Sequence, residues 1–267
     1  MLKRRAAVVA TGWVGDTLAC TAAAISLAEE RDFLVDFYMK WPQIQALLSY
    51  DERFNTHLYK DNGLGRIRLW SKLKNYDLVV KEPSQWSHNE PFTAELRRMA
   101  GCIPTPEFDL PVGNVLRHHK QIKPGKPLIV ISRDMYTRAF GRDVDLFVRG
   151  LEPYFEISWV GLPPDRNSRK GKELDLMQDA EKICMADCFV GPEGGMLWLA
   201  GGLGQRTIYF TERIQHAKET LGRGDSFKAV GNENIFPNGR HVALPLYCTN
   251  DEAIRIIVNS ISCNSGI

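Results

Sequence analysis

The sequence predicts an α/β protein made of two Rossmann-like domains that face a central cleft. Two observations favour this fold class. Short apolar runs alternate with amphipathic stretches of helix length. The alternation starts again after a basic segment, residues 117–126, whose last three residues begin the sequence Pro-Gly-Lys-Pro. Because proline and glycine break helices and strands, that segment is the predicted linker. We therefore expect an N-terminal domain over residues 1–120 and a C-terminal domain over residues 121–267.

The first half opens with a strand, a glycine turn and a helix, which together form the first βα unit of an open parallel sheet. Residues 5–11 (RAAVVAT) are a short apolar run typical of a buried strand. Residues 12–16 carry two glycines, and residues 17–30 combine high helix propensity with an apolar face. The other elements expected here are strands over residues 33–39, 56–59 and 76–80 and helices over residues 42–49 and 93–100.

The second half repeats this pattern. Residues 128–132 (LIVIS) predict a buried strand, and residues 194–203 predict a helix that Gly204 ends. We expect helices to begin at Asp143 and near Asp251. An aspartate side chain at a helix start can accept hydrogen bonds from the backbone N–H groups of the first turn. The other elements expected here are strands over residues 155–160, 188–190 and 206–210 and helices over residues 143–151, 174–186 and 251–262.

Composition excludes several classes of protein. With 267 residues, 44% of them hydrophobic and 25% charged, the chain is typical of a globular protein and not of a disordered chain, a collagen or a coiled coil. A formal net charge of +2 argues against a generic nucleic-acid coat, although it leaves room for a local basic groove. No apolar run reaches the roughly 18 residues that a membrane-spanning helix needs.

The N-terminus and the cysteines predict a cytoplasmic protein. Basic residues 3–5 precede an apolar run, as in a signal peptide, but Gly12, Gly15 and Asp16 interrupt that run, so we expect a strand and a helix instead. The six cysteines contain no CxxC pair, and no cysteine–histidine cluster has the spacing of a zinc site. We therefore expect reduced thiols and no metal site.

Three segments that follow predicted strands are candidates for a functional site. The first is the turn over residues 12–16, whose glycines permit a tight turn and a close backbone approach at the carboxyl end of a strand, where open α/β sheets bind ligands. Asp16 stands at the start of the next helix. Its alternative role is structural, as a first-turn aspartate stabilised by the helix dipole. Neither GxGxxG nor GxxxxGK[ST] is present.

The second segment is Glu193-Gly-Gly195, between a predicted strand and a predicted helix. Backbone N–H groups at a helix start without side chains in the way form an anion site, which predicts that Gly194 and Gly195 bind an anion. Glu193 at its edge could accept hydrogen bonds from sugar hydroxyls. The alternative is a plain turn in which the glycines serve packing.

The third segment follows the strand over residues 128–132. Arg133 and Arg138 would clamp a diphosphate there through bidentate hydrogen bonds. The alternative is surface pairing with Asp134 or Asp143.

Two of these segments resemble the heptosyltransferase-type glycosyltransferases, glycosyltransferase family 9, which have the GT-B fold of two Rossmann-like domains. The family's first strand leads into a Gly-Asp-x-Leu turn, which is Gly15-Asp-Thr-Leu18 here. Its second domain carries Asp-[Thr/Ser]-Gly-x-x-His-Leu-Ala, with which Glu193-Gly-Gly-Met-Leu-Trp-Leu-Ala200 aligns without gaps. The flanking residues 186–192 and 203–210 are similar too. The sequence departs from the motif at Glu193, Gly194 and Trp198, which replace Asp, Thr/Ser and His.

The resemblance implies an enzyme that moves a sugar from a nucleotide-diphosphate sugar to an acceptor hydroxyl, with inversion and without a metal ion or cofactor. Such a transfer needs a carboxylate base, and Asp16 is similar by position to the family's proposed base. The diphosphate leaving group needs positive charge and N–H donors, for which the resemblance points to Arg133, Arg138, Gly194 and Gly195.

The same resemblance divides the remaining contacts between the domains. The C-terminal domain would bind the donor, with Glu193 at the sugar or ribose hydroxyls and Gly161 and Leu162 near the nucleotide base. The N-terminal domain would face the acceptor through Gly12, Trp13 and Gly15. Independently of the resemblance, Trp86 and His88 stand in a polar loop of this domain and are candidates for the acceptor side, with partly buried packing as the alternative role.

Several alternatives stay open. The resemblance points to a lipopolysaccharide-type saccharide as acceptor, whereas the basic segment over residues 117–126 would also suit transfer to a hydroxymethylated base in phage DNA. A nucleotide-sugar epimerase or hydrolase, or a non-catalytic nucleotide-sugar binder, would use the same scaffold. The donor sugar, the nucleotide base and the oligomeric state are not fixed by the sequence.

Overall fold

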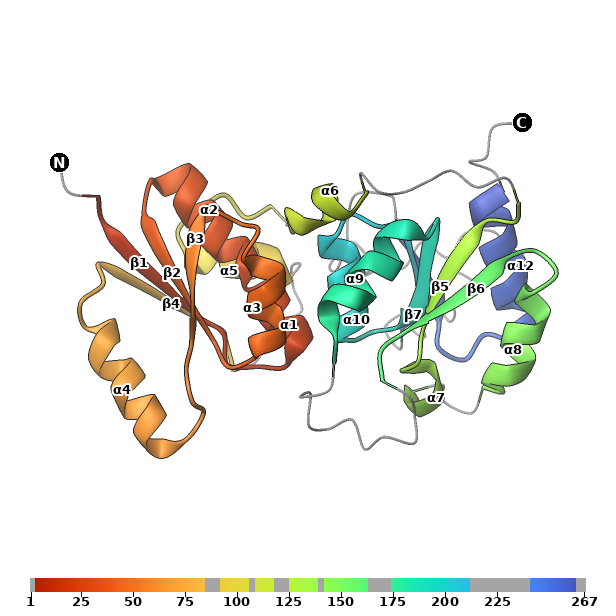
Figure 1. The fold of residues 1–267 in the computed structure, drawn as a ribbon, viewed down its shortest axis with the longest axis horizontal. Coiled ribbons are helices and arrows are strands. Elements are labelled where there is room, and N and C mark those ends of the chain that lie inside the picture. Colours follow the sequence, from red (N-terminus) through yellow and green to blue (C-terminus); the bar gives the residue numbers. More distant parts are fainter. Residues whose placement is uncertain are drawn as a thin grey trace, which may run out of the picture. The chain divides into compact units, whose positions relative to one another are not determined.

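The computed structural model describes residues 3–84, 92–105, 109–117, 125–138, 142–162, 174–211 and 241–262. The chain divides into two compact units, Met1–Val112 and Gly113–Ile267. Each unit is a parallel β-sheet with helices packed on it, as Figure 1 shows. The predicted α/β class with one sheet in each half is therefore confirmed.

The first unit contains a four-stranded sheet in the spatial order β3-β2-β1-β4. Its strands are β1 (Arg5–Val9), β2 (Leu34–Met39), β3 (Phe54–Leu58) and β4 (Leu78–Lys81). Its helices are α1 (Val14–Ala19), α2 (Thr21–Arg31), α3 (Pro42–Leu48), α4 (Gly63–Leu73) and α5 (Phe92–Met99).

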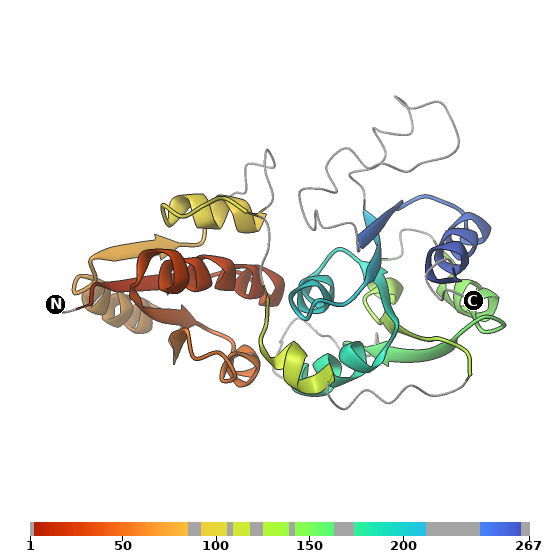
Figure 2. The same ribbon diagram turned by 90° about the horizontal axis from the view of Figure 1, so that it is seen from above.

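Helices cover both faces of this sheet, so its central strand is apolar on both sides. In β1, Ala7 and Val9 pack against Leu69 and Leu73 of α4. The alternate residues of β1 point to the other face, where α2 packs on β1 and β2 and lies beside α5 (Figure 2). The small and branched residues of the run RAAVV suit this central position because parallel strands are buried on both faces.

Two features of the first unit differ from expectation. The single helix predicted over residues 17–30 is two helices that meet at Cys20, and the first begins at Val14 because Trp13 is extended and acts as its N-cap. Helix α4 was not predicted, because Gly63 and Gly65 are typical of a loop. Asn62 compensates for them by accepting a hydrogen bond from the Gly65 N–H at 2.8 Å.

The second unit contains a five-stranded parallel sheet in the order β6-β5-β7-β8-β9. Its strands are β5 (Leu128–Ser132), β6 (Glu156–Val160), β7 (Cys188–Pro192), β8 (Thr207–Thr211) and β9 (His241–Pro245). Its helices are α6 (Val112–Arg117), α7 (Met135–Arg138), α8 (Val144–Leu151), α9 (Leu176–Met185), α10 (Gly195–Gly202) and α12 (Asn250–Ser262). Strand β9 and helices α6 and α7 were not predicted.

The core of the second unit joins the sheet to α8 and α12, which pack against each other. Phe147 of α8 and Ile257 of α12 are fully buried against residues of β5 and β7. Asp143 caps α8 as predicted, since it accepts a hydrogen bond from the Leu146 N–H at 2.9 Å. Asp251 lies in the first turn of α12, where Thr249 and Glu252 supply the reciprocal capping bonds.

The division of the chain falls after residue 112 and so precedes the predicted boundary at residue 120. The reason is Arg117, whose guanidinium donates hydrogen bonds to the carbonyl oxygens of Leu203 and Gly204 and so fastens α6 to the second unit. Most of the predicted linker lies outside the described residues. Among the helices of the described residues, none combines the length and the apolar composition that a membrane span requires. The five described cysteines are buried, and none of them forms a disulfide with another.

Candidate active site

The predicted residues of the first unit gather at a topological switch point. The chain runs from β1 outward through β2 and β3, and then returns to place β4 on the other side of β1. Loops that leave the carboxyl ends of β1 and β4 therefore diverge there, and such points are where open α/β sheets bind ligands. The turn that carries Gly12 and Asp16 follows β1, and Glu82 directly follows β4.

Asp16 is tied to the start of α1. Its Oδ2 accepts a hydrogen bond from the Trp13 N–H at 3.1 Å, so the structural role of a first-turn aspartate is present. No described residue donates a hydrogen bond to Oδ1. The side chain is half-buried, and its second oxygen has acceptor capacity to spare.

Glu82 is a site residue that sequence reasoning missed, because no recognised motif follows the strand predicted over residues 76–80. Its Oε2 accepts hydrogen bonds from the N–H groups of both Thr11 and Gly12, each at 2.7 Å. Burial raises the pKa of Glu82, the nearby charge of Asp16 adds to this rise, and the two N–H donors and Lys40 oppose it. The signal available in the sequence was its position just after the strand predicted over residues 76–80.

Gly12 lies between the two carboxylates. A Cβ atom at this position would overlap Glu82 Oε1 and would lie 2.7 Å from Asp16 Oδ2. The glycines of this turn were predicted to permit a close approach to the backbone. At Gly12, the groups that approach the backbone closely are the side chains of Glu82 and Asp16. Any larger residue would have to separate them.

An aromatic pair flanks the carboxylates. Trp13 is 64% exposed and stacks on Trp41, with ring centroids 5.9 Å apart. Trp41 donates from its indole nitrogen to the Gly12 carbonyl at 3.0 Å, and Lys40 donates to the Thr11 carbonyl at 2.6 Å. Gly15 is buried within α1. Trp86 and His88, which were predicted on the same side, lie outside the described residues.

The second unit has its own switch point, between β5 and β7. Arg133 follows β5, and its Nη1 donates to the Gly161 carbonyl at the end of β6 at 3.0 Å. Gly161 has φ +83°, a conformation that favours glycine, and its N–H donates to Asp179 Oδ2 at 3.2 Å. Leu162 follows, half-buried.

Asp179 was also missed by sequence reasoning, because an acidic residue within a helix usually lies on the solvated face. This side chain is only 7% exposed. Burial raises its pKa to about 6, against the lowering effects of the Gly161 N–H and Lys182. The group therefore holds the loop after β6 in place while its charge is poorly solvated.

The Glu193-Gly-Gly195 segment follows β7, on the other side of the same switch point. Glu193 accepts a hydrogen bond from the Thr211 hydroxyl, which orients its carboxylate across the ends of β7 and β8. Gly194 is the N-cap of α10 and supplies no side-chain cap, so no side chain of the N-cap satisfies the first N–H groups of this eight-residue helix.

These parts of the second unit are neighbours. A Cβ on Gly161 would lie 3.8 Å from the side chain of Met196, in the first turn of α10, and 3.9 Å from the Arg133 nitrogen. Arg133, Gly161 and the start of α10 are thus brought together. Arg138 ends the short helix α7, and its side chain is not among those described.

Comparison with known proteins identifies solved structures of similar fold, but no protein of similar sequence. No family model and no curated protein matches the sequence. Among solved structures, a glycosyltransferase of family 9 from Veillonella parvula superposes with a TM-score of 0.63 at 8% identity, over 98% of this chain and 99% of that one. The E. coli heptosyltransferase WaaC, solved with ADP, gives 0.62 at 13% identity, over 96% and 99%.

A further match is the iron-containing dodecameric glycosyltransferase TibC from enterotoxigenic E. coli, with a TM-score of 0.57 at 13% identity. It covers 78% of this chain, which spans 58% of the length of TibC. These matches agree with the two parallel sheets described above. The chain therefore has the GT-B-like fold of the heptosyltransferases.

Proposed function

We propose that this protein is a glycosyltransferase that moves a sugar from a nucleotide-diphosphate sugar to an acceptor hydroxyl. The observation that carries the proposal is that both switch points hold residues suited to this reaction. Asp16 lies at the switch point of the first sheet, and Arg133 and the start of α10, which has no side-chain cap, lie at the switch point of the second sheet. A fold shared with heptosyltransferases supports it.

The donor would bind to the second unit. The N–H groups at Gly195 and the charge of Arg133 suit a diphosphate, because a helix start and a guanidinium both stabilise phosphate oxygens. Glu193, held by Thr211, would accept a sugar or ribose hydroxyl, and the loop at Gly161 and Leu162 would lie near the base. WaaC with ADP and TibC with ADP-heptose make an adenosine diphosphate sugar the first donor to test.

The acceptor would bind to the first unit. Asp16 would take the proton of the acceptor hydroxyl as its oxygen bonds to the anomeric carbon, while the bond from that carbon to the diphosphate breaks and the nucleotide leaves with the electron pair. The exposed ring of Trp13 offers a flat surface on which a saccharide ring stacks. We propose inversion at the anomeric carbon and a lipopolysaccharide-type saccharide as acceptor, with Trp86, His88 and Arg138 in the supporting roles given above.

The developing charge on the diphosphate would be stabilised by Arg133 and the helix N–H groups, without a metal ion. The proposed location is the cytoplasm, where the cysteine thiols would stay reduced.

The deciding experiment is a thermal-shift series with ADP, UDP, GDP and their sugars, since a ligand of the native state raises Tm by mass action. We expect one nucleoside diphosphate and its sugar to raise Tm, and transfer to follow when an acceptor is added. Free sugar formed from donor alone would indicate a hydrolase, a new sugar an epimerase, and binding without product a non-catalytic binder. Loss of transfer in EDTA would contradict the metal-independent mechanism.

A further inference from the structure

Helix α4 turns its apolar side chains toward solvent. Leu64, Ile67 and Trp70 are 70%, 65% and 48% exposed. Leu69 and Leu73 alone are buried against the sheet. A surface helix normally directs its apolar stripe to the core, so an outward stripe of this kind needs a partner that excludes water.

The same segment is strongly basic. Between residues 60 and 74 it carries five cations, Lys60, Arg66, Arg68, Lys72 and Lys74, and a single acid, Asp61. Asp61 is engaged by Arg66 at 2.7 Å and by Lys40 at 3.5 Å. Arg68 and Lys72 form no ion pair with any residue that the structure describes. The apolar stripe is therefore bordered by unneutralised positive charge.

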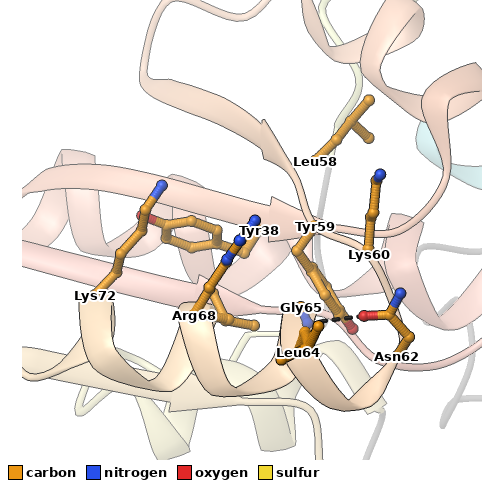
Figure 3. Close-up of a pocket in the computed structure, with 10 residues that line it drawn as sticks. Tyr38, Leu58, Tyr59, Lys60, Asn62, Leu64, Gly65, Arg68 and Lys72 are labelled. Atoms are coloured by element: carbon orange, nitrogen blue, oxygen red, sulfur yellow. Dashed lines mark hydrogen bonds between the residues drawn. The ribbon is translucent and has the colours of Figure 1, made fainter.

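A cavity of about 360 Å³ lies between α4 and the sheet edge. Figure 3 shows Arg68 and Lys72 on α4 beside Tyr38, and Lys60 on the connection between β3 and α4. Tyr59 forms part of the wall and donates from its hydroxyl to the Ala10 carbonyl at 3.1 Å. Three cations around an aromatic-walled cavity suit a phosphate group.

From this combination we infer that α4 is a membrane-docking helix. Leu64, Ile67 and Trp70 enter the headgroup region of an anionic bilayer, and Lys60, Arg68 and Lys72 bind its phosphates. An outward apolar stripe with basic flanks is the pattern of helices that lie in the membrane plane. At 11 residues, α4 is too short to span a bilayer.

A nucleic acid would explain only half of this surface. Phosphate contacts use cations, but Leu64 and Ile67 would gain nothing from a duplex backbone. A bilayer uses both features at once, since cations are attracted to anionic lipid and apolar side chains are removed from water. The inference depends on α4 alone and does not need the proposed transfer reaction.

The test is co-sedimentation of the full chain with phosphatidylcholine vesicles that contain roughly 30% phosphatidylglycerol, or none. We expect binding that is much stronger with the anionic lipid. The pair Leu64→Ser and Ile67→Ser should lower the partition coefficient at least about tenfold. Arg68→Gln with Lys72→Gln should remove most of the preference for anionic lipid.

Matched controls lie on the second unit. Leu146→Ser changes an apolar residue that is 56% exposed on α8, and Arg255→Gln removes an exposed cation of α12. Both should bind as the wild type does, and circular dichroism should show every variant folded. The inference is wrong if the wild type does not bind anionic vesicles, or if the α4 variants bind as well as the controls. Binding of duplex DNA in place of vesicles would likewise overturn it.

Discussion

Glu82 holds the backbone of Gly12: its Oε2 accepts the Gly12 N–H at 2.7 Å, and the Thr11 N–H at the same distance. An acid at the end of β4 thereby fixes the turn that leaves β1. Asp16 is linked to that turn through the Trp13 N–H. Any displacement of Gly12 would therefore be transmitted to the proposed catalytic carboxylate.

The first prediction concerns Glu82 as a positioning residue. Glu82→Ala leaves two backbone donors without their acceptor, so we expect a loss of about 1–3 kcal/mol in the free energy of unfolding and at least a tenfold fall in kcat. Glu82→Gln can place its amide oxygen where Oε2 lies and should restore most of both. Urea unfolding and initial rates measure the two quantities. Equal losses in both variants would show that the charge, and not the anchoring, is what matters.

The second prediction uses a pair of glycines. Gly12→Ala forces a Cβ against Glu82 and Asp16, so it should cost about 1–3 kcal/mol and lower kcat, because the carboxylates must move apart. Gly63→Ala is the control, since a Cβ there meets nothing within 4 Å. The comparison of unfolding curves and rates isolates the crowding at Gly12. If the two variants have the same free energy of unfolding and the same kcat, the close contact of Gly12 with Glu82 and Asp16 does not matter for stability or activity.

The third prediction concerns Asp16 itself. Asp16→Asn keeps an oxygen that can accept the Trp13 N–H, so folding and the nucleotide-induced Tm shift should persist. The amide cannot take a proton from the acceptor, and kcat should fall by about 10²–10⁴. Turnover at the wild-type rate would remove Asp16 from the mechanism.

Sequence reasoning located the fold because its signals are local. Strands β1 and β5 are apolar runs buried on both faces, and their position in the chain is visible in composition alone. The elements that it missed are held by tertiary contacts. Helix α4 begins with glycines and depends on the Asn62 cap, and α6 depends on bonds from Arg117 to residues almost ninety positions away.

The candidate site was predicted where a motif and a strand end coincide, as at Asp16, Arg133 and Gly194. Glu82 and Asp179 escaped because each acts on a glycine turn that is distant in sequence, Gly12 and Gly161 respectively. Pairing of β1 with β4 creates the first of these contacts, and packing of α9 on β6 creates the second. A single sequence shows the polar residue and the glycine but not the strand order or the helix packing that brings them together.

The fourth prediction concerns donor binding. Arg133→Gln removes the positive charge beside the start of α10, so we expect the Kd for the nucleoside diphosphate to rise about 10–100-fold, the range of a charged hydrogen bond. Arg149→Gln changes an exposed arginine of α8 and should leave the Kd unchanged. Calorimetric titration of both variants gives the comparison. An unaltered Kd for Arg133→Gln would exclude this arginine from the diphosphate site.

The last prediction concerns the buried carboxyl of Asp179, whose pKa burial raises from 3.8 to about 6. The folded protein then retains a proton that the unfolded chain has released between these pH values. Protonated Asp179 therefore contributes to the free energy of unfolding. This contribution is fully present below pH 3.8 and is lost as the pH rises through about 6. A rise of this size corresponds to about 3 kcal/mol.

The variant Asp179→Asn has no proton to release and retains an oxygen to accept the Gly161 N–H. Its free energy of unfolding should therefore change less than that of the wild type across this pH range. Asp251→Asn, on the first turn of α12, should keep the wild-type slope. Urea unfolding at several pH values between about 4 and 7 measures all three proteins. A slope in Asp179→Asn equal to that of the wild type would mean that the carboxyl of Asp179 is already ionised in the folded protein, and that it holds the Gly161 loop as an anion.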